Sequence, residues 1–155
     1  MILSFNLKQE TSKYLNLIFI FFIIFFYTNT SLALSDEQFN KIKKLIEQQN
    51  IERSFELLKT FNLGEKKLSP KALLLFGKIY LELGNPQKAN KYFEEVIFSS
   101  TSFDEFAYAG IARSEFMYGN LLKSKEMAEV SLNINPNLLE SKVILAKVLS
   151  ELNYD

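Results

Sequence analysis

From residue 35 onward, apolar residues recur at intervals of three and four positions, with polar residues between them. An α-helix has ~3.6 residues per turn, so this spacing gathers the apolar side chains on one face. The clearest stripes are Leu73, Phe76, Gly77, Tyr80 and Leu81, and then Ala89, Tyr92, Phe93, Val96 and Ile97. No stretch of useful length alternates with the period of two that a strand requires. The pattern therefore predicts an all-α fold of amphipathic helices, each roughly 11 to 16 residues long.

Helix start signals precede several of the predicted helices. A serine or asparagine followed three positions later by Glu or Gln can cap free backbone N–H groups reciprocally. Such pairs are Ser35 with Gln38, Ser102 with Glu105, and Asn137 with Glu140. Pro70 follows Ser69, and proline is favoured at the first helical position because no hydrogen bond is lost there. These residues predict where four of the helices begin.

The turns between the predicted helices repeat along the chain. Similar segments begin at Gln49, Gly84 and Gly119 at one constant interval, and a fourth begins at Asn153 after an interval one position shorter. Helices this short are marginal alone and need neighbours to cover their apolar faces. A period of about 34 residues built from two helices indicates a repeat protein.

This period and its residues resemble the tetratricopeptide repeat family, whose unit is a helix–turn–helix of about 34 residues. The best copy, Pro70 to Phe103, has Leu73, Phe76, Gly77, Tyr80, Gly84, Ala89, Phe93 and Val96 at the family's spacings. The next has Tyr108, Ile111, Ala112, Gly119, Ser124, Ala128 and Pro136, and the last has Leu145, Ala146 and Leu149. The resemblance implies an antiparallel helix-pair solenoid with units at about 34–68, 69–103 and 104–138 and a partial unit at 139–155.

Some positions depart from the family pattern. Glu115 stands where a large apolar residue usually packs, and Gly110 offers a competing register two residues before Ala112. The period of the turns favours the register that Gly119 sets. The first unit is degenerate, with polar residues where apolar ones are expected, at Gln38 and Lys41.

The segment 1–33 has the three-part layout of a secretory signal. A basic start precedes an apolar run at 17–27, and small residues lead up to Ala33. We predict that 1–33 is a signal peptide cleaved after Ala33 and that 34–155 forms the exported domain. The alternative is an uncleaved inner-membrane anchor, since the uncharged stretch 14–35 can span a bilayer of ~30 Å. Either interpretation places the rest of the chain across a membrane, in the periplasm or cell envelope.

Composition excludes several classes of function. The chain has 155 residues without His or Cys, so a His/Cys zinc site, a thiol nucleophile and a Ser-His-Asp triad are all ruled out. The 18 Lys+Arg balance the 18 Asp+Glu, which gives no bulk electrostatic case for nucleic acid. We therefore expect a non-catalytic protein without a metal or cofactor.

The family resemblance implies a concave groove, lined by the first helix of each pair, that holds an extended peptide or a partner helix. A basic residue stands six positions before each turn, at Lys43, Lys78, Arg113 and Lys147. Such a ladder of positive charge can bind an acidic segment or a chain terminus. The alternative is an ordinary solvated face, because three of these bases have a glutamate four residues later, at Glu47, Glu82 and Glu151.

Arg113 differs from the other three bases because the residue four positions later is Met117. We expect Arg113 to be unpaired and to lie beside exposed aromatic side chains at Phe106 and Phe116. That combination is typical of a protein-binding hot spot. The alternative is a surface arginine that lies over Phe116 without a role.

The last predicted helix has an apolar stripe that no following helix covers. The stripe includes Val143, Leu145, Leu149 and Leu152. Because a solenoid normally ends in a polar capping helix, we expect either that the chain is a longer protein truncated at Asp155 or that this face binds a partner or a second copy of the chain.

Together these features predict a protein–protein interaction module of the cell envelope, with a protein or peptide partner. The alternative is the docking arm of a larger envelope enzyme, secretion or transport protein, truncated at Asp155.

Overall fold

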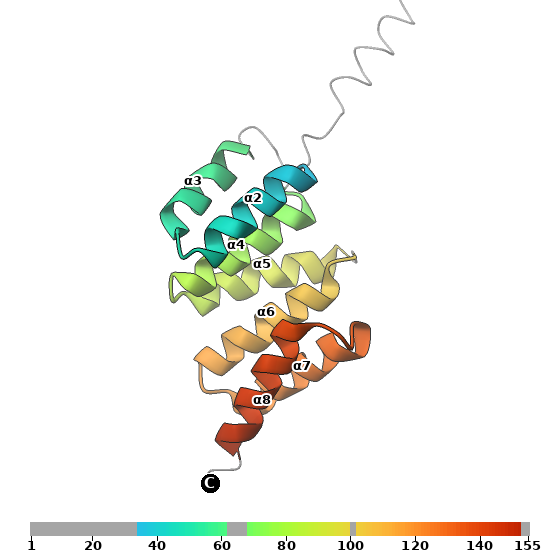
Figure 1. Ribbon diagram of the computed structural model, residues 1–155. Helices are drawn as coiled ribbons and strands as arrows, with labels where there is room; N and C mark the ends of the chain where they lie inside the picture. Colours follow the sequence, from blue (N-terminus) through green and yellow to red (C-terminus); the bar gives the residue numbers. More distant parts are fainter. Residues whose placement is uncertain (1–33, 62–67, 100–101, 153–155) are drawn as a thin grey trace, which may run out of the picture. The chain divides into compact units, whose positions relative to one another are not determined.

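The computed structural model describes residues 34–61, 68–99 and 102–152, and within them the protein is entirely α-helical (Figure 1). Seven helices follow one another along this part of the chain, and it contains no strand. They are α2 (Asp36–Glu47), α3 (Ile51–Phe61), α4 (Pro70–Glu82), α5 (Pro86–Phe98), α6 (Asp104–Met117), α7 (Leu121–Ile134) and α8 (Leu139–Leu152). The predicted all-α class is confirmed.

The described residues belong to one compact unit, Leu34–Asp155. The segment 1–33 lies outside the described residues, so the signal peptide, its cleavage site and the alternative anchor stay predictions. None of the helices in the described ranges combines the length and apolar character needed to cross a bilayer.

Two of the predicted helix starts are confirmed. Ser35 and Gln38 form a capping box before α2, with backbone-to-side-chain distances of 3.2 and 2.9 Å. Ser69 caps α4 by accepting a hydrogen bond from the backbone N–H of Ala72, and Pro70 occupies the first helical position.

The other two predicted starts are wrong. Helix α6 begins one residue after Phe103, which makes no side-chain capping bond, so Ser102 is not its cap. Helix α8 begins at Leu139 rather than directly after Asn137, whose backbone N–H instead donates to Asn135 Oδ1 at 3.1 Å. The carboxylate of Glu140, which the sequence assigns to this second cap, instead forms an ion pair with Lys78 of α4.

The turns repeat with the predicted period. Gln49, Gly84 and Gly119 all have a positive φ, of 60°, 67° and 79°. After each of them an asparagine N–H closes the preceding helix by donating to a carbonyl five positions earlier, at 2.8 to 2.9 Å, in the pairs Asn50–Leu45, Asn85–Tyr80 and Asn120–Glu115. This is the Schellman-type closure that favours glycine. The turn period and the register set by Gly119 are therefore confirmed in the described residues.

Gln49 occupies a left-handed backbone position that the two later turns give to glycine. A side chain there costs roughly 1 kcal/mol, since its Cβ crowds the following carbonyl. We expect Gln49→Gly to raise the free energy of unfolding by about 0.5–1 kcal/mol and Gly84→Ala to lower it by about 1 kcal/mol. A Cβ at Gly84 meets no atom within 4 Å, so that change reports on the backbone alone. Urea unfolding of the two variants checks both signs; two shifts in the same direction would refute the explanation.

The first helices of the pairs form one continuous row. Helix α2 packs on α4, α4 on α6 and α6 on α8, whereas α3, α5 and α7 each contact the first helices on either side and not one another. The first helices therefore lie closer to one another than the second helices do. A groove along their row is lined by side chains of α2, α4, α6 and α8.

Phe93 of α5 is the largest fully buried side chain of the described residues. Its ring lies against Gly77 of α4 and Gly110 of α6, where a Cβ on either glycine would come within 2.4 Å of a ring atom. Gly110 therefore does not signal a competing register, as its position suggested. It is small because the ring of the preceding unit occupies the space that its side chain would need.

Candidate interaction site

The described residues contain a groove between the first helices α6 and α8, with a cavity volume of about 600 Å³. Three of its side chains are large, apolar and exposed: Met117 by 44%, Leu139 by 72% and Val143 by 44%. We call this the α6–α8 groove, and it is lined by Arg113, Phe116, Met117, Leu139, Glu140, Val143, Ile144 and Lys147. Apolar side chains exposed together are typical of an interaction surface.

The helix period decides which side chains of α8 face this groove. Leu139, Val143 and Lys147 are spaced four positions apart and share one face. Val148, on another face, is fully buried against the helices that precede α8. The helix thus keeps one apolar face for the core and offers a second one to the solvent.

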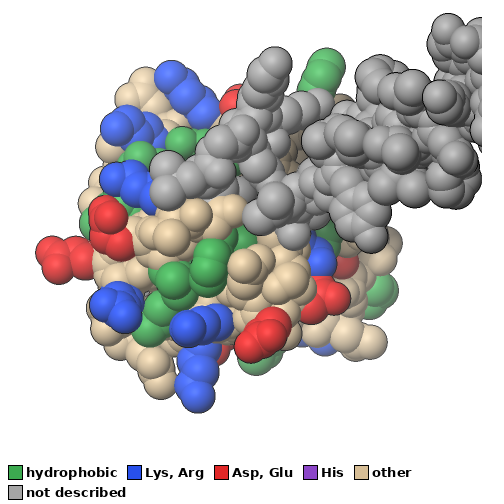
Figure 2. All heavy atoms as spheres, turned by 90° about the horizontal axis from the view of Figure 1, so that it is seen from above, with side chains coloured by type: hydrophobic (Ala, Val, Ile, Leu, Met, Phe, Trp, Pro, Cys, Tyr) green, Lys and Arg blue, Asp and Glu red, His purple; other side chains and the backbone are tan. Residues whose placement is uncertain are grey.

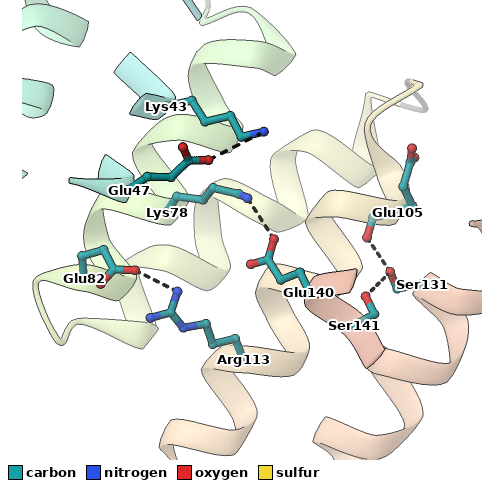
Figure 3. A network of polar contacts seen from close by, with 9 residues as sticks. All are labelled: Lys43, Glu47, Lys78, Glu82, Glu105, Arg113, Ser131, Glu140 and Ser141. Atoms are coloured by element: carbon teal, nitrogen blue, oxygen red, sulfur yellow. Dashed lines mark hydrogen bonds and ion pairs between the residues drawn. The ribbon is translucent and has the colours of Figure 1, made fainter. Parts of the chain in front are cut away.

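A buried serine pair holds α8 in place beside α6 and α7. Ser131 Oγ donates to the backbone carbonyl of Glu105 at 2.7 Å and lies 2.7 Å from Ser141 Oγ (Figure 3). Both serines are fully buried. Their hydrogen bonds join three helices, so they fix the wall of the groove to which Leu139 and Val143 belong.

The bases of the predicted ladder do not all pair with the glutamate four positions later (Figure 3). Lys43 does pair with Glu47, at 3.9 Å. Lys78 instead reaches from α4 to Glu140 at the start of α8, at 2.9 Å. Both partners of this second pair are mostly buried, and the pair joins first helices that lie two units apart.

The expectation that Arg113 is unpaired is wrong. Its Nη1 lies 2.8 Å from Glu82 Oε1, so α6 is tied to α4 by an ion pair that sequence spacing alone did not reveal. Lys147, by contrast, has no ion-pair partner among the described residues, and Glu151 on the next turn does not come within 4 Å of it.

The structure brings only some of the predicted site residues together. Arg113, Phe116 and Lys147 line the α6–α8 groove. Phe106 does not; it packs against the core between α4 and α6, with its ring 6.5 Å from that of Phe103. Lys43 and Lys78 likewise lie outside the groove lining, although Lys78 reaches its edge through Glu140.

The predicted uncovered face of α8 is about half covered. Leu145 and Leu152 pack against the core cluster of α6, α7 and α8, so their expected exposure is wrong. Val143 and Leu149 are exposed, as predicted. The groove residues that sequence analysis missed are Met117, Leu139, Glu140 and Ile144; the spacing of Leu139 to Val143 and Lys147 was the available signal.

Glu115 forms a second polar site, buried where α5, α6 and α7 meet. Its side chain is only 4% exposed, and its carboxylate accepts bonds from Lys123 at 2.7 Å, Asn120 at 2.8 Å and Asn90 at 3.4 Å. Burial alone raises the pKa of Glu115, but the bonds from Lys123, Asn120 and Asn90 outweigh burial and hold the pKa below its ordinary value. A glutamate at this usually apolar position therefore joins α5, α6 and α7 through its hydrogen bonds and ion pair.

The face drawn in Figure 2 is mixed in chemical character. Lysine and arginine side chains are interspersed with acidic and hydrophobic ones there, in keeping with the zero net charge. In the described ranges, no group of acidic residues is arranged so that it could hold a metal ion.

The fold and groove define an all-α protein built from repeated helix–turn–helix units. Comparison of the chain with protein-family models, with curated proteins and with solved structures finds no match.

Proposed function

We propose that this protein is a non-catalytic protein–protein interaction module of the tetratricopeptide type, which binds a peptide or helix of a partner in the α6–α8 groove. The observation that carries the proposal is the open groove of about 600 Å³ with Met117, Leu139 and Val143 exposed together. Large exposed apolar side chains in a concave site are commonly anchors for a partner. The confirmed turn period supports the tetratricopeptide assignment, which is carried by the residue pattern.

Selection from a library of random displayed peptides tests this function on the full chain in a non-ionic detergent. We expect selected peptides to lose at least about tenfold in affinity for Val143→Glu, because a carboxylate then lies on the apolar wall of the groove. Leu122→Glu is the matched control, since Leu122 is also an exposed aliphatic side chain but lies on α7 outside the groove. Peptides that bind Val143→Glu as tightly as the wild type would contradict groove binding.

We also propose that the module acts outside the cytoplasm, in the periplasm or cell envelope. The support is the layout of the segment 1–33, with basic residues, an apolar run and small residues in order. We expect the intact mass of the protein isolated from its native cells to equal that of a chain that begins at Leu34. A mass that includes the segment 1–33, found in the membrane fraction, would favour the anchor at 14–35, and the full chain in the cytoplasm would refute export.

A further inference from the structure

The charges that line the α6–α8 groove are not equally available to a partner. Arg113 is paired with Glu82 at 2.8 Å, and Glu140 is paired with Lys78 at 2.9 Å. Lys147 is exposed and has no ion-pair partner in the described part of the chain. After internal pairing, the groove therefore presents one uncompensated positive charge.

This charge stands at the end of an apolar row. Leu139, Val143 and Lys147 succeed one another along α8 at intervals of four positions, which corresponds to about 6 Å per step and about 12 Å in all. Phe116 and Met117 of α6 form the opposite wall. A ridge with a period of four is the surface into which the side chains of a second helix pack.

We propose that the occupant of the α6–α8 groove is an amphipathic helix of a partner protein that carries a carboxylate. Two aliphatic side chains one turn apart contact Leu139, Val143 and Met117, and an aspartate or glutamate on the following turn pairs with Lys147. The inference rests on the proposed function and adds the chemistry of the partner. A single uncompensated cation matches one carboxylate, whereas a polyanion such as nucleic acid needs many basic contacts.

Three synthetic helical peptides test the inference, each about 15 residues long, near the length at which an isolated alanine-rich helix begins to form. Each has an alanine-based sequence, two leucines four positions apart, and Glu, Gln or Lys four positions after the second leucine. Their affinities for the full chain are measured by fluorescence anisotropy in a non-ionic detergent at low salt. We expect the Glu peptide to bind about threefold more tightly than the Gln peptide, as a solvent-exposed ion pair allows, and the Lys peptide to bind most weakly.

Substitutions of Lys147 test the proposed ion pair directly. Lys147→Glu is expected to invert the order, so that the Lys peptide binds best, and Lys147→Met is expected to abolish the difference between the Glu and Gln peptides. Lys142→Glu is the matched control, because Lys142 is an exposed lysine of α8 that does not line the groove, and it leaves the wild-type order unchanged. All three changes are at exposed positions, and unfolding curves verify that the variants fold.

The two ways of failing can be told apart. Equal affinity for the Glu and Gln peptides, with binding lost in Val143→Glu, overturns the carboxylate inference and leaves groove binding intact. Absence of any binding that depends on Val143 overturns both this inference and the proposed function.

Discussion

Replacing Phe93 with alanine is expected to lower the free energy of unfolding by about 3–5 kcal/mol. The side chain is completely buried and joins α5 to both α4 and α6. Its removal leaves a cavity that helices fixed by their turns cannot close, so transfer and cavity costs add. Urea unfolding followed by circular dichroism measures the change. Destabilisation of less than about 1 kcal/mol would show that the ring is not packed as described.

The glycine beside this ring provides a sharper control. In the wild type, Gly110→Ala is expected to cost about 1–3 kcal/mol, since its Cβ would lie 2.4 Å from the ring of Phe93. In the Phe93→Ala background the obstacle is gone, and alanine is a better helix former than glycine by up to about 1 kcal/mol. The same substitution should therefore change sign. If it destabilises both backgrounds equally, the ring is not the reason that residue 110 is small.

Much of the architecture follows from local sequence. The turns at Gly84 and Gly119 were predictable because few residue types adopt a positive φ and because the two segments are alike. The cap at Ser35 was predictable for a similar reason, since its partner is three positions away. Local chemistry of this kind does not depend on how distant segments meet.

The ion pairs of the site were not predictable in this way. Lys78 and Glu82 have the spacing of a local pair, yet each pairs with another helix, at Glu140 and Arg113. The choice depends on how closely α4, α6 and α8 approach one another, which the spacing along one helix does not encode. The wrong cap at Asn137 has the same origin, because the carboxylate expected there is held by Lys78.

For Glu115, the sequence shows that a carboxylate stands at a position that is usually apolar. It does not show the partners of that carboxylate, because they come from α5, the turn after α6, and α7. We expect Glu115→Gln to lower the free energy of unfolding at pH 7 by about 2 kcal/mol. The neutral amide removes the ion pair with Lys123. Its NH2 group must also face donors, either that of Asn120 at the Oε2 position or those of Lys123 and Asn90 at the Oε1 position.

The cost of that substitution should depend on pH in a defined direction. Because the folded-state pKa of Glu115 is held below its ordinary value, the carboxylate stabilises the fold fully above about pH 4.3, the ordinary pKa of a glutamate. This stabilisation is lost as the pH falls further, through the lower pKa of the folded state. The difference in unfolding free energy between wild type and Glu115→Gln should therefore be constant from pH 7 to about pH 5 and shrink below about pH 4.

Comparison with a second glutamine variant separates this effect from general acid destabilisation. Glu52 is exposed on the first turn of α3 and has no ion pair among the described residues, so Glu52→Gln should cost less than about 1 kcal/mol at pH 7. Unfolding of the three proteins in urea at pH 7, 5, 4 and 3 gives the required differences. A gap between wild type and Glu115→Gln that stays constant down to pH 3 would mean that the carboxylate is not protonated in that range or that its charge does not stabilise the fold. A gap that closes as the pH falls would show that the charged form of Glu115 stabilises the fold. The bond from Lys123 then explains why a buried carboxylate is tolerated between three helices.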